Sequence, residues 1–108
     1  MNIFAAFRAR IEESIRELVR QGVVNDSADL SRISVEPPRE ASHGDMATNA
    51  AMVLGKFSEL QPRDLAGKIA DLLSEDKDIA AIDIAGPGFI NLSLAPSVWQ
   101  GQVANVLR

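Results

Sequence analysis

The sequence predicts an α+β domain: a small antiparallel sheet of at least three strands, ending in a C-terminal β-hairpin, with about four helices packed on it. Apolar residues recur at steps of three and four over residues 2–21, as on one face of an amphipathic helix. Near the C-terminus, two alternating runs flank Gly86-Pro87-Gly88, which is typical of a hairpin. At 108 residues, the whole of 1–108 fits a single domain.

The first half of the chain predicts a helix, a strand and a second helix. Gly22 is a suitable C-cap for the helix over 2–21. Residues 33–36 alternate between apolar and polar side chains, which predicts a short strand, and the prolines that follow end it because they cannot donate to a ladder. The next helix is predicted over 46–57, with an apolar face formed by Met46, Ala50, Val53, Leu54 and Phe57.

The second half predicts a third helix, the hairpin and a last helix. Pro62 suits the first position of the third helix. The hairpin strands are predicted over 79–85 and 89–94, and Pro96 then begins the last helix. This helix meets no capping signal before the chain ends, so we expect it to continue in a longer protein. Its apolar face is formed by Trp99, Val103, Val106 and Leu107.

Composition excludes several classes of function. The chain has no cysteine, which rules out disulfides, cysteine–zinc sites and thiol catalysis. It has no apolar run long enough to cross a bilayer and no signal peptide, so we expect a cytoplasmic protein with no membrane partner. Its 15 acidic and 11 basic residues give a net charge of −4, the wrong sign for a protein that binds nucleic acid mainly through phosphates. We expect no DNA partner.

The sequence offers no convincing catalytic or metal site. His43 lies beside Asp45 and could form an acid/base pair with it, but a metal site needs three or four ligands and there is no second histidine or cysteine. A role in shaping the loop or in a contact is the stronger interpretation of His43. The Gly86-Pro87-Gly88 segment is not predicted to bind phosphate, because Pro87 has no N–H and a strand is predicted after it instead of a helix. We therefore predict no catalytic residue, no metal and no cofactor in this domain.

One pair of side chains points to nucleic acid. The core face of the last predicted strand is formed by Ile90, Leu92 and Leu94. Because side chains alternate along a strand, Phe89 and Asn91 are predicted on the opposite face. An aromatic ring beside a carboxamide can stack on a base and hydrogen-bond its edge. Two alternatives stay open at this point: a helix could cover this face, or Phe89 could fold over the turn.

Four segments together resemble the N-terminal additional domain of bacterial arginyl-tRNA synthetases, in the same order and over essentially the whole chain. They are Val35-Glu36-Pro37-Pro38-Arg39, His43-Gly44-Asp45-Met46-Ala47-Thr48-Asn49, Pro62-Arg63-Asp64-Leu65-Ala66 and Ala85-Gly86-Pro87-Gly88-Phe89-Ile90-Asn91. The second and fourth are the specific ones, and the combination is stronger than any one of them.

The resemblance implies a domain that binds at the elbow of tRNA(Arg) and contacts its D-loop. It implies that Phe89 and Asn91 are the leading contact residues, together with Gly86 and Gly88 of the turn, and that Gly44 and Asp45 shape their loop. The parent ligase uses ATP and Mg in a catalytic domain of the same polypeptide. The motifs of that domain, of the His-x-Gly-His and Lys-Met-Ser-Lys-Ser types, do not occur in this chain.

Two other interpretations compete with an RNA-contacting domain. A protein-docking module without any RNA contact would bind a partner protein and be indifferent to salt. A free-standing RNA-binding protein is disfavoured by the net charge of −4.

We predict that the 108-residue chain catalyses no arginine-dependent exchange between ATP and pyrophosphate, because it has no nucleotide-binding motif and a single histidine. Exchange would be followed with labelled pyrophosphate against a buffer control. Activity of the pure chain above that control would contradict the interpretation as a non-catalytic domain.

Overall fold

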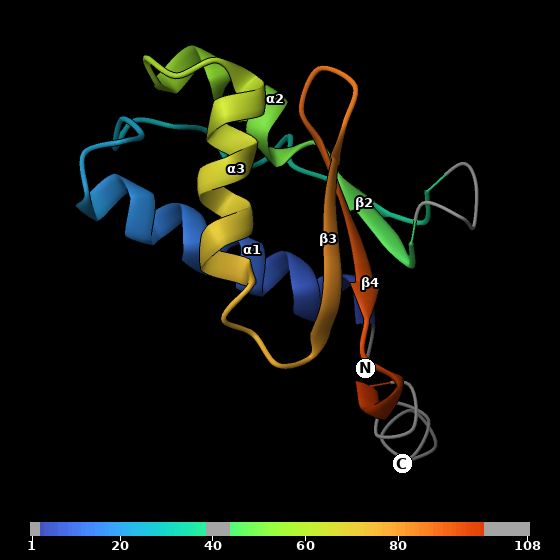
Figure 1. Cartoon of the computed structure of the whole chain (residues 1–108). Coiled ribbons are helices and arrows are strands. Elements are labelled where there is room, and N and C mark those ends of the chain that lie inside the picture. Colours follow the sequence, from blue (N-terminus) through green and yellow to red (C-terminus); the bar gives the residue numbers. More distant parts are fainter. Residues whose placement is uncertain (1–2, 39–43, 99–108) are drawn as a thin grey trace.

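The computed structural model describes residues 3–38 and 44–98, which form a four-stranded antiparallel sheet with helices on one side (Figure 1). The strand order is β1-β2-β4-β3, and β3 and β4 form the C-terminal hairpin. The predicted α+β class is therefore confirmed. In chain order the elements are α1 (Ile3–Arg20), β1 (Val35–Glu36), β2 (Met46–Thr48), α2 (Ala50–Leu54), the 3₁₀ helix η2 (Gly55–Phe57), α3 (Pro62–Leu73), β3 (Ile79–Ala85) and β4 (Phe89–Leu94).

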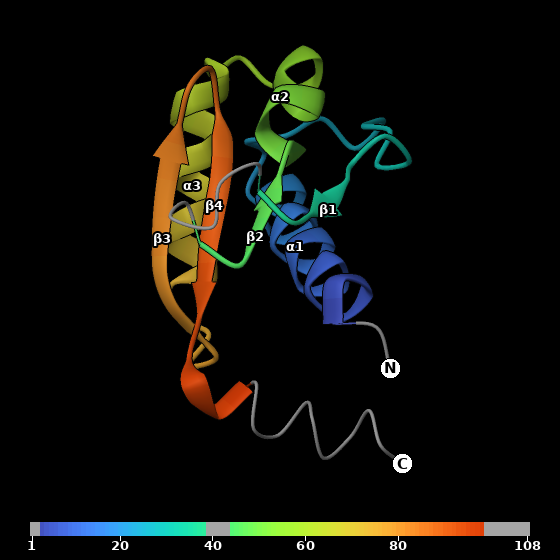
Figure 2. The ribbon, with the colours of Figure 1, turned by 90° about the vertical axis from the view of Figure 1, so that its right-hand side faces the viewer.

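The core lies between the sheet and the helices α1 and α3. Figure 1 shows both helices on the same side of the strands, and in Figure 2, where the opposite face of the sheet is turned to the viewer, they lie behind it. Within the described residues, no helix lies on that opposite face. The apolar stripes predicted from the sequence are buried against the sheet: Phe7, Ile11, Ile15 and Leu18 of α1, Leu65, Ile69 and Leu73 of α3, and Ile90, Leu92 and Leu94 of β4.

The prediction of one continuous helix over 46–57 is wrong. Met46–Thr48 is the strand β2, and only the later part of the segment is helical, as the short α2 and then η2. Met46 pairs with Leu92 and Thr48 pairs with Ile90, both in antiparallel register with β4. A strand of three residues is too short to show its alternation, and pairing with a neighbouring strand outweighs local helical preference.

Gly44 and Asp45 hold the start of β2 against β4. The backbone N–H of Asp45 donates to the carbonyl oxygen of Leu92 at 2.8 Å, and Oδ2 of Asp45 accepts from the N–H of Leu94 at 2.7 Å. Gly44 has a φ of +110°, and a Cβ at this position would lie 2.7 Å from the Leu92 oxygen. Glycine is therefore required here both by the backbone angle and by the approach of β4.

Thr48 and Asn49 continue the connection from β2 into α2 and towards β1. The hydroxyl oxygen of Thr48, which is buried, accepts from the N–H of Ala50 at 3.2 Å. The Asn49 carboxamide accepts from the N–H of Ser34 at 2.8 Å and donates to the carbonyl of Arg32 at 3.3 Å. The segment 44–49 thus joins β4, α2 and the approach to β1 into one unit.

The hairpin turn is packed against the N-terminus of α3. Gly86 and Gly88 both have positive φ, at +55° and +143°. A Cβ at Gly88 would lie 3.1 Å from the Cβ of Pro62, and the guanidinium of Arg63 donates to the carbonyl oxygen of Gly86. The turn is therefore held to α3 by close packing and by a hydrogen bond.

Two sequence expectations fall outside the described residues. His43 lies there, as does the apolar face formed by Trp99, Val103, Val106 and Leu107. Residues 96–98 are helical, beginning at Pro96 as predicted. None of the helices in the described ranges combines the length and apolar character needed to cross a membrane.

Gly44→Ala is predicted to lower the free energy of unfolding by about 2 kcal/mol, because alanine disfavours this φ and its Cβ collides with the Leu92 carbonyl. Gly67→Ala in α3 is the matched control, since nothing lies within 4 Å of the added Cβ. Alanine favours the helix there and should stabilise by up to about 1 kcal/mol. Urea unfolding of both variants measures the two changes, and a Gly44 variant as stable as the Gly67 variant would contradict the prediction.

Candidate functional site

The face of the sheet turned away from α1 and α3 is the candidate site, and we call it the outer face. Register places one row of side chains across it: Glu36 opposite Ala47, Ala47 opposite Asn91, and Asn91 opposite Asp83. Rows on either side pair Phe89 with Ala85 and Ser93 with Ala81. The outer face therefore consists of Glu36, Ala47, Ala81, Asp83, Ala85, Phe89, Asn91 and Ser93, with all four strands contributing.

Phe89 is the prominent apolar group of this face. Its side chain is 42% exposed, and it is the one large hydrophobic residue that is exposed in the part of the chain described. It follows the hairpin turn directly, and its cross-strand partner is the small Ala85, so its ring has no large neighbour in that pair. The core-facing Ile90 beside it is fully buried, as the alternation of side chains along a strand requires.

Asn91 lies on the outer face but is much less accessible than the sequence suggested. It is only 7% exposed, and its cross-strand neighbours are Ala47 of β2 and Asp83 of β3. Within residues 3–38 and 44–98, no hydrogen bond engages its carboxamide, and no fully buried side-chain nitrogen or oxygen lacks a partner. The carboxamide therefore has no hydrogen-bond partner among these residues and only a small exposed surface.

The glycine-containing segments singled out in the sequence lie at opposite ends of β4. Gly86 and Gly88 form the turn immediately before Phe89. Gly44 and Asp45 lie beside the far end of the strand, where a Cβ at Gly44 would be 3.0 Å from the hydroxyl of Ser93. The structure therefore brings the turn to Phe89 but does not bring Gly44 and Asp45 to it.

The charge that the four strands give to the outer face is negative. Glu36 and Asp83 stand at the two ends of the row that contains Asn91, and the strands contribute no lysine or arginine. Sequence reasoning did not single out Asp83, although the inward-facing Ile82 and Ile84 on either side of it place it outward. A face of this kind can bind the donor groups and π-faces of bases, but it repels phosphates.

The arginines of α1 do not form a free basic surface. Arg10 binds Asp76 and Asp78 at 2.8 and 3.0 Å and lies 4.4 Å from the centre of the Phe7 ring. The other three arginines of the helix each pair with a glutamate of the same helix: Arg8 with Glu12, Arg16 with Glu13 and Arg20 with Glu17. These pairs reduce the attraction of α1 for a polyanion.

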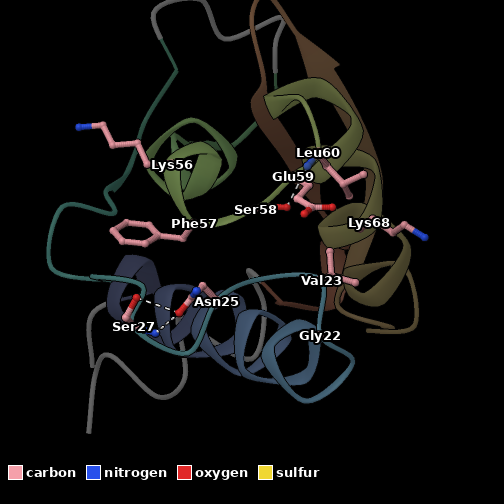
Figure 3. A pocket seen from close by; sticks show the side chains of 10 residues that line it. All are labelled: Gly22, Val23, Asn25, Ser27, Lys56, Phe57, Ser58, Glu59, Leu60 and Lys68. Atoms are coloured by element: carbon pink, nitrogen blue, oxygen red, sulfur yellow. Dashed lines mark hydrogen bonds between the residues drawn. The ribbon is translucent and has the colours of Figure 1, made fainter.

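A groove of about 760 Å³ lies elsewhere, between the loop that follows α1 and the segment from η2 to α3. Figure 3 shows Lys56 and Lys68 at opposite sides of this groove, with their ammonium groups pointing away from each other. Phe57 and Glu59 line it between them. The two ammonium groups do not point to a common position, so they are not arranged to bind a single anionic group together.

Two features of the described residues bear on catalysis: possible metal ligands and carboxyl groups with a shifted pKa. These residues contain no cluster of three or more His, Cys, Asp or Glu side chains that could hold a metal ion. Hydrogen bonding and charge from Arg20, together with a hydrogen bond from Gln21, lower the pKa of Glu17, and hydrogen bonds from Ser31 lower the pKa of Asp29. Both carboxyl groups lie on the surface and away from the outer face, so neither marks an acid/base centre.

Comparison with known proteins agrees with the sequence motifs. Residues 5–94 match the family model of the arginyl tRNA synthetase N terminal domain. Arginine–tRNA ligases of Parvibaculum lavamentivorans, Brucella anthropi and Brucella ovis are 48%, 51% and 52% identical to the chain over all 108 of its residues. The chain spans 18% of the length of each of these relatives. It belongs to the family of arginyl-tRNA synthetase N-terminal domains.

Proposed function

We propose that this domain binds the D-loop at the elbow of tRNA(Arg) and so supports arginylation by the ligase that carries it. The observation on which this proposal rests is the exposed Phe89 ring on the outer face, next to the carboxamide of Asn91. Membership of the family and the relatives named arginine–tRNA ligase support tRNA as the partner.

Each contact residue would have a separate role. The Phe89 ring would stack on an unstacked base, a contact that tolerates any base because every base has a π-face. The Asn91 carboxamide would hydrogen-bond the edge of a base through the part of it that is exposed, and so discriminate between bases. Gly86 and Gly88 would contribute through their positive φ angles, which shape the turn that places Phe89 at the start of β4.

The reaction itself belongs to another part of the polypeptide. The described residues offer no metal cluster, and the turn at Gly86-Pro87-Gly88 leads into a strand and not into a helix that could hold phosphates. Because the chain spans only 18% of the length of its ligase relatives, we assign ATP, Mg and arginine to the catalytic domain of the ligase that carries this domain, acting in the cytoplasm. That domain would also supply most of the positive surface that tRNA requires.

A protein-docking module without RNA contact is the alternative. Such a module would use the groove between the loop after α1 and η2, or another surface, to bind a partner domain. Its binding would be indifferent to salt and to the Phe89 ring. Substitution of Phe89 separates the two functions, because only tRNA binding depends on its ring.

In the ligase that carries this domain, Phe89→Ala is predicted to weaken tRNA(Arg) binding by about 1–3 kcal/mol, the range for loss of a base–aromatic stack. Phe89→Leu should lose a similar amount, because it keeps apolar volume without a π-face, whereas Phe89→Tyr should retain binding. Asn91→Ala should cost less affinity and more discrimination between tRNA sequences. The KM for tRNA and the dissociation constant, measured at several salt concentrations, report these changes, which should persist as salt rises.

Ile90→Ala is the matched control for folding. Ile90 is fully buried on the core face, so its truncation should lower the free energy of unfolding by about 2–5 kcal/mol. Phe89→Ala should lower it by less than about 1 kcal/mol, because the ring is 42% exposed. If Phe89→Ala destabilises the domain as much as Ile90→Ala and leaves tRNA binding unchanged, Phe89 is a structural residue and the docking alternative gains support.

A further inference from the structure

We propose that Asp83 is a further base-reading residue, whose carboxylate accepts a hydrogen bond from the exocyclic amino group of the base that lies against Phe89 and Asn91. This inference rests on the proposed function, because it assigns the chemistry of the ligand at the same face. It adds a specificity-determining residue and a class of base: guanine, cytosine or adenine, which carry an amino group, and not uracil, which carries none.

The sheet register places Asp83 next to the proposed contact residues. Asp83 is the cross-strand partner of Asn91, and Ala85 two residues further along β3 is the partner of Phe89. Side chains directly opposite each other have Cβ atoms about 5 Å apart, and diagonal neighbours lie about 7–8 Å apart. A base that covers Phe89 and reaches Asn91 would therefore come within hydrogen-bonding reach of Asp83.

Asp83 is available for such a contact. It is exposed, and no hydrogen bond or ion pair engages its carboxylate among the residues described. Its neighbour Asn91 likewise makes no hydrogen bond there, so the two groups do not satisfy each other. Aspartate is disfavoured in strands, and nothing in the fold requires it at this position.

The charge of Asp83 indicates what it can bind. A carboxylate only accepts hydrogen bonds, so it pairs with amino groups, as when aspartate or glutamate accepts from the N4 amino group of cytosine. The carbonyl oxygens of uracil would be repelled, and so would phosphates. The four strands contribute no lysine or arginine to the outer face, so a ligand that donates hydrogen bonds suits Asp83 better than one that brings further negative charge.

The direction in which a substitution of Asp83 changes tRNA affinity distinguishes a base-contacting carboxylate from one that merely repels the RNA. If Asp83 only repels the RNA, removing its charge should tighten binding, most strongly at low salt. If it accepts a hydrogen bond from a base, removing it should weaken binding despite the lower repulsion. We expect Asp83→Asn to raise the dissociation constant for tRNA(Arg) about fivefold and Asp83→Ala about tenfold, the size of one hydrogen bond after the relief of repulsion is subtracted.

Glu36→Gln is the matched control. Glu36 is an exposed carboxylate on the same face and in the same row, but it stands at the opposite edge of the sheet. With strands about 4.8 Å apart, it lies about 14 Å from Asp83 and about 10 Å from Asn91. Its replacement should leave binding unchanged or tighten it. A Glu36 variant that weakens binding as much as Asp83→Asn would overturn the assignment to Asp83.

The experiment uses the ligase that carries this domain and tRNA(Arg) transcripts. In these transcripts, amino-bearing nucleotides of the D-loop are replaced one at a time by analogues without the amine: inosine for guanosine and purine riboside for adenosine, with uridine for cytidine. One replacement should weaken binding by the wild type about as much as Asp83→Asn does, and should have no further effect in the Asp83→Asn variant. Fully additive effects for every replacement would overturn the proposal.

Phe89→Ala, run in parallel, separates failure of this inference from failure of the proposed function. If Phe89→Ala weakens binding while Asp83→Asn tightens it or leaves it unchanged, the tRNA contact stands and the role of Asp83 is refuted. If Phe89→Ala has no effect, the proposed function itself fails. Unfolding midpoints are measured for both Asp83 variants, and Asp83→Asn, which preserves side-chain shape, decides the outcome if Asp83→Ala unfolds the domain.

Discussion

The pairing of β2 with β4 is the interaction on which the rest of the domain depends. It makes β4 a central strand, and it is fixed at its start by the two hydrogen bonds between Asp45 and β4 and by the absence of a Cβ at Gly44. Asn49, one residue beyond β2, forms hydrogen bonds with the backbone of Arg32 and Ser34, which precede β1. Without β2, Asn91 would belong to an edge strand, and the outer face would end at β4.

The same pairing shows where sequence reasoning succeeded and where it failed. The strands 79–85 and 89–94 were predicted with their observed bounds, because alternation over six or seven residues and a turn rich in glycine give a strong local signal. The strand Met46–Thr48 was missed, since Met46 also fits a helical face that continues into α2. Phe89 was placed on the correct face with its exposure predicted, whereas the low exposure of Asn91, at 7%, was not predicted.

Charge is divided within the domain in a way that suits a contact with bases. Four arginines of α1 are engaged by acidic partners, two of which, Asp76 and Asp78, lie between α3 and β3 and tie the helix to the sheet. The sequence alone could not reveal that Arg10 pairs with a residue 66 positions away. The outer face retains carboxylates and small side chains around one aromatic ring. Affinity for phosphates must therefore come from outside this face, while shape and hydrogen bonding at the face can supply selectivity.

The position of Phe89 follows from how the hairpin turn is held. An exposed aromatic ring contributes little to stability, so its location must be fixed by the backbone beneath it. Gly88 packs its backbone against Pro62, Arg63 bonds the carbonyl of Gly86, and Ile90 anchors the strand in the core immediately after Phe89. The ring is thus presented from a backbone restrained on both sides. Restraint of this kind lowers the conformational entropy lost on binding, because the contact surface is already in place before the ligand arrives. A small acidic domain can on this basis contribute to recognition of a large polyanion: it adds a preformed surface for a base and leaves the phosphates to the rest of the molecule.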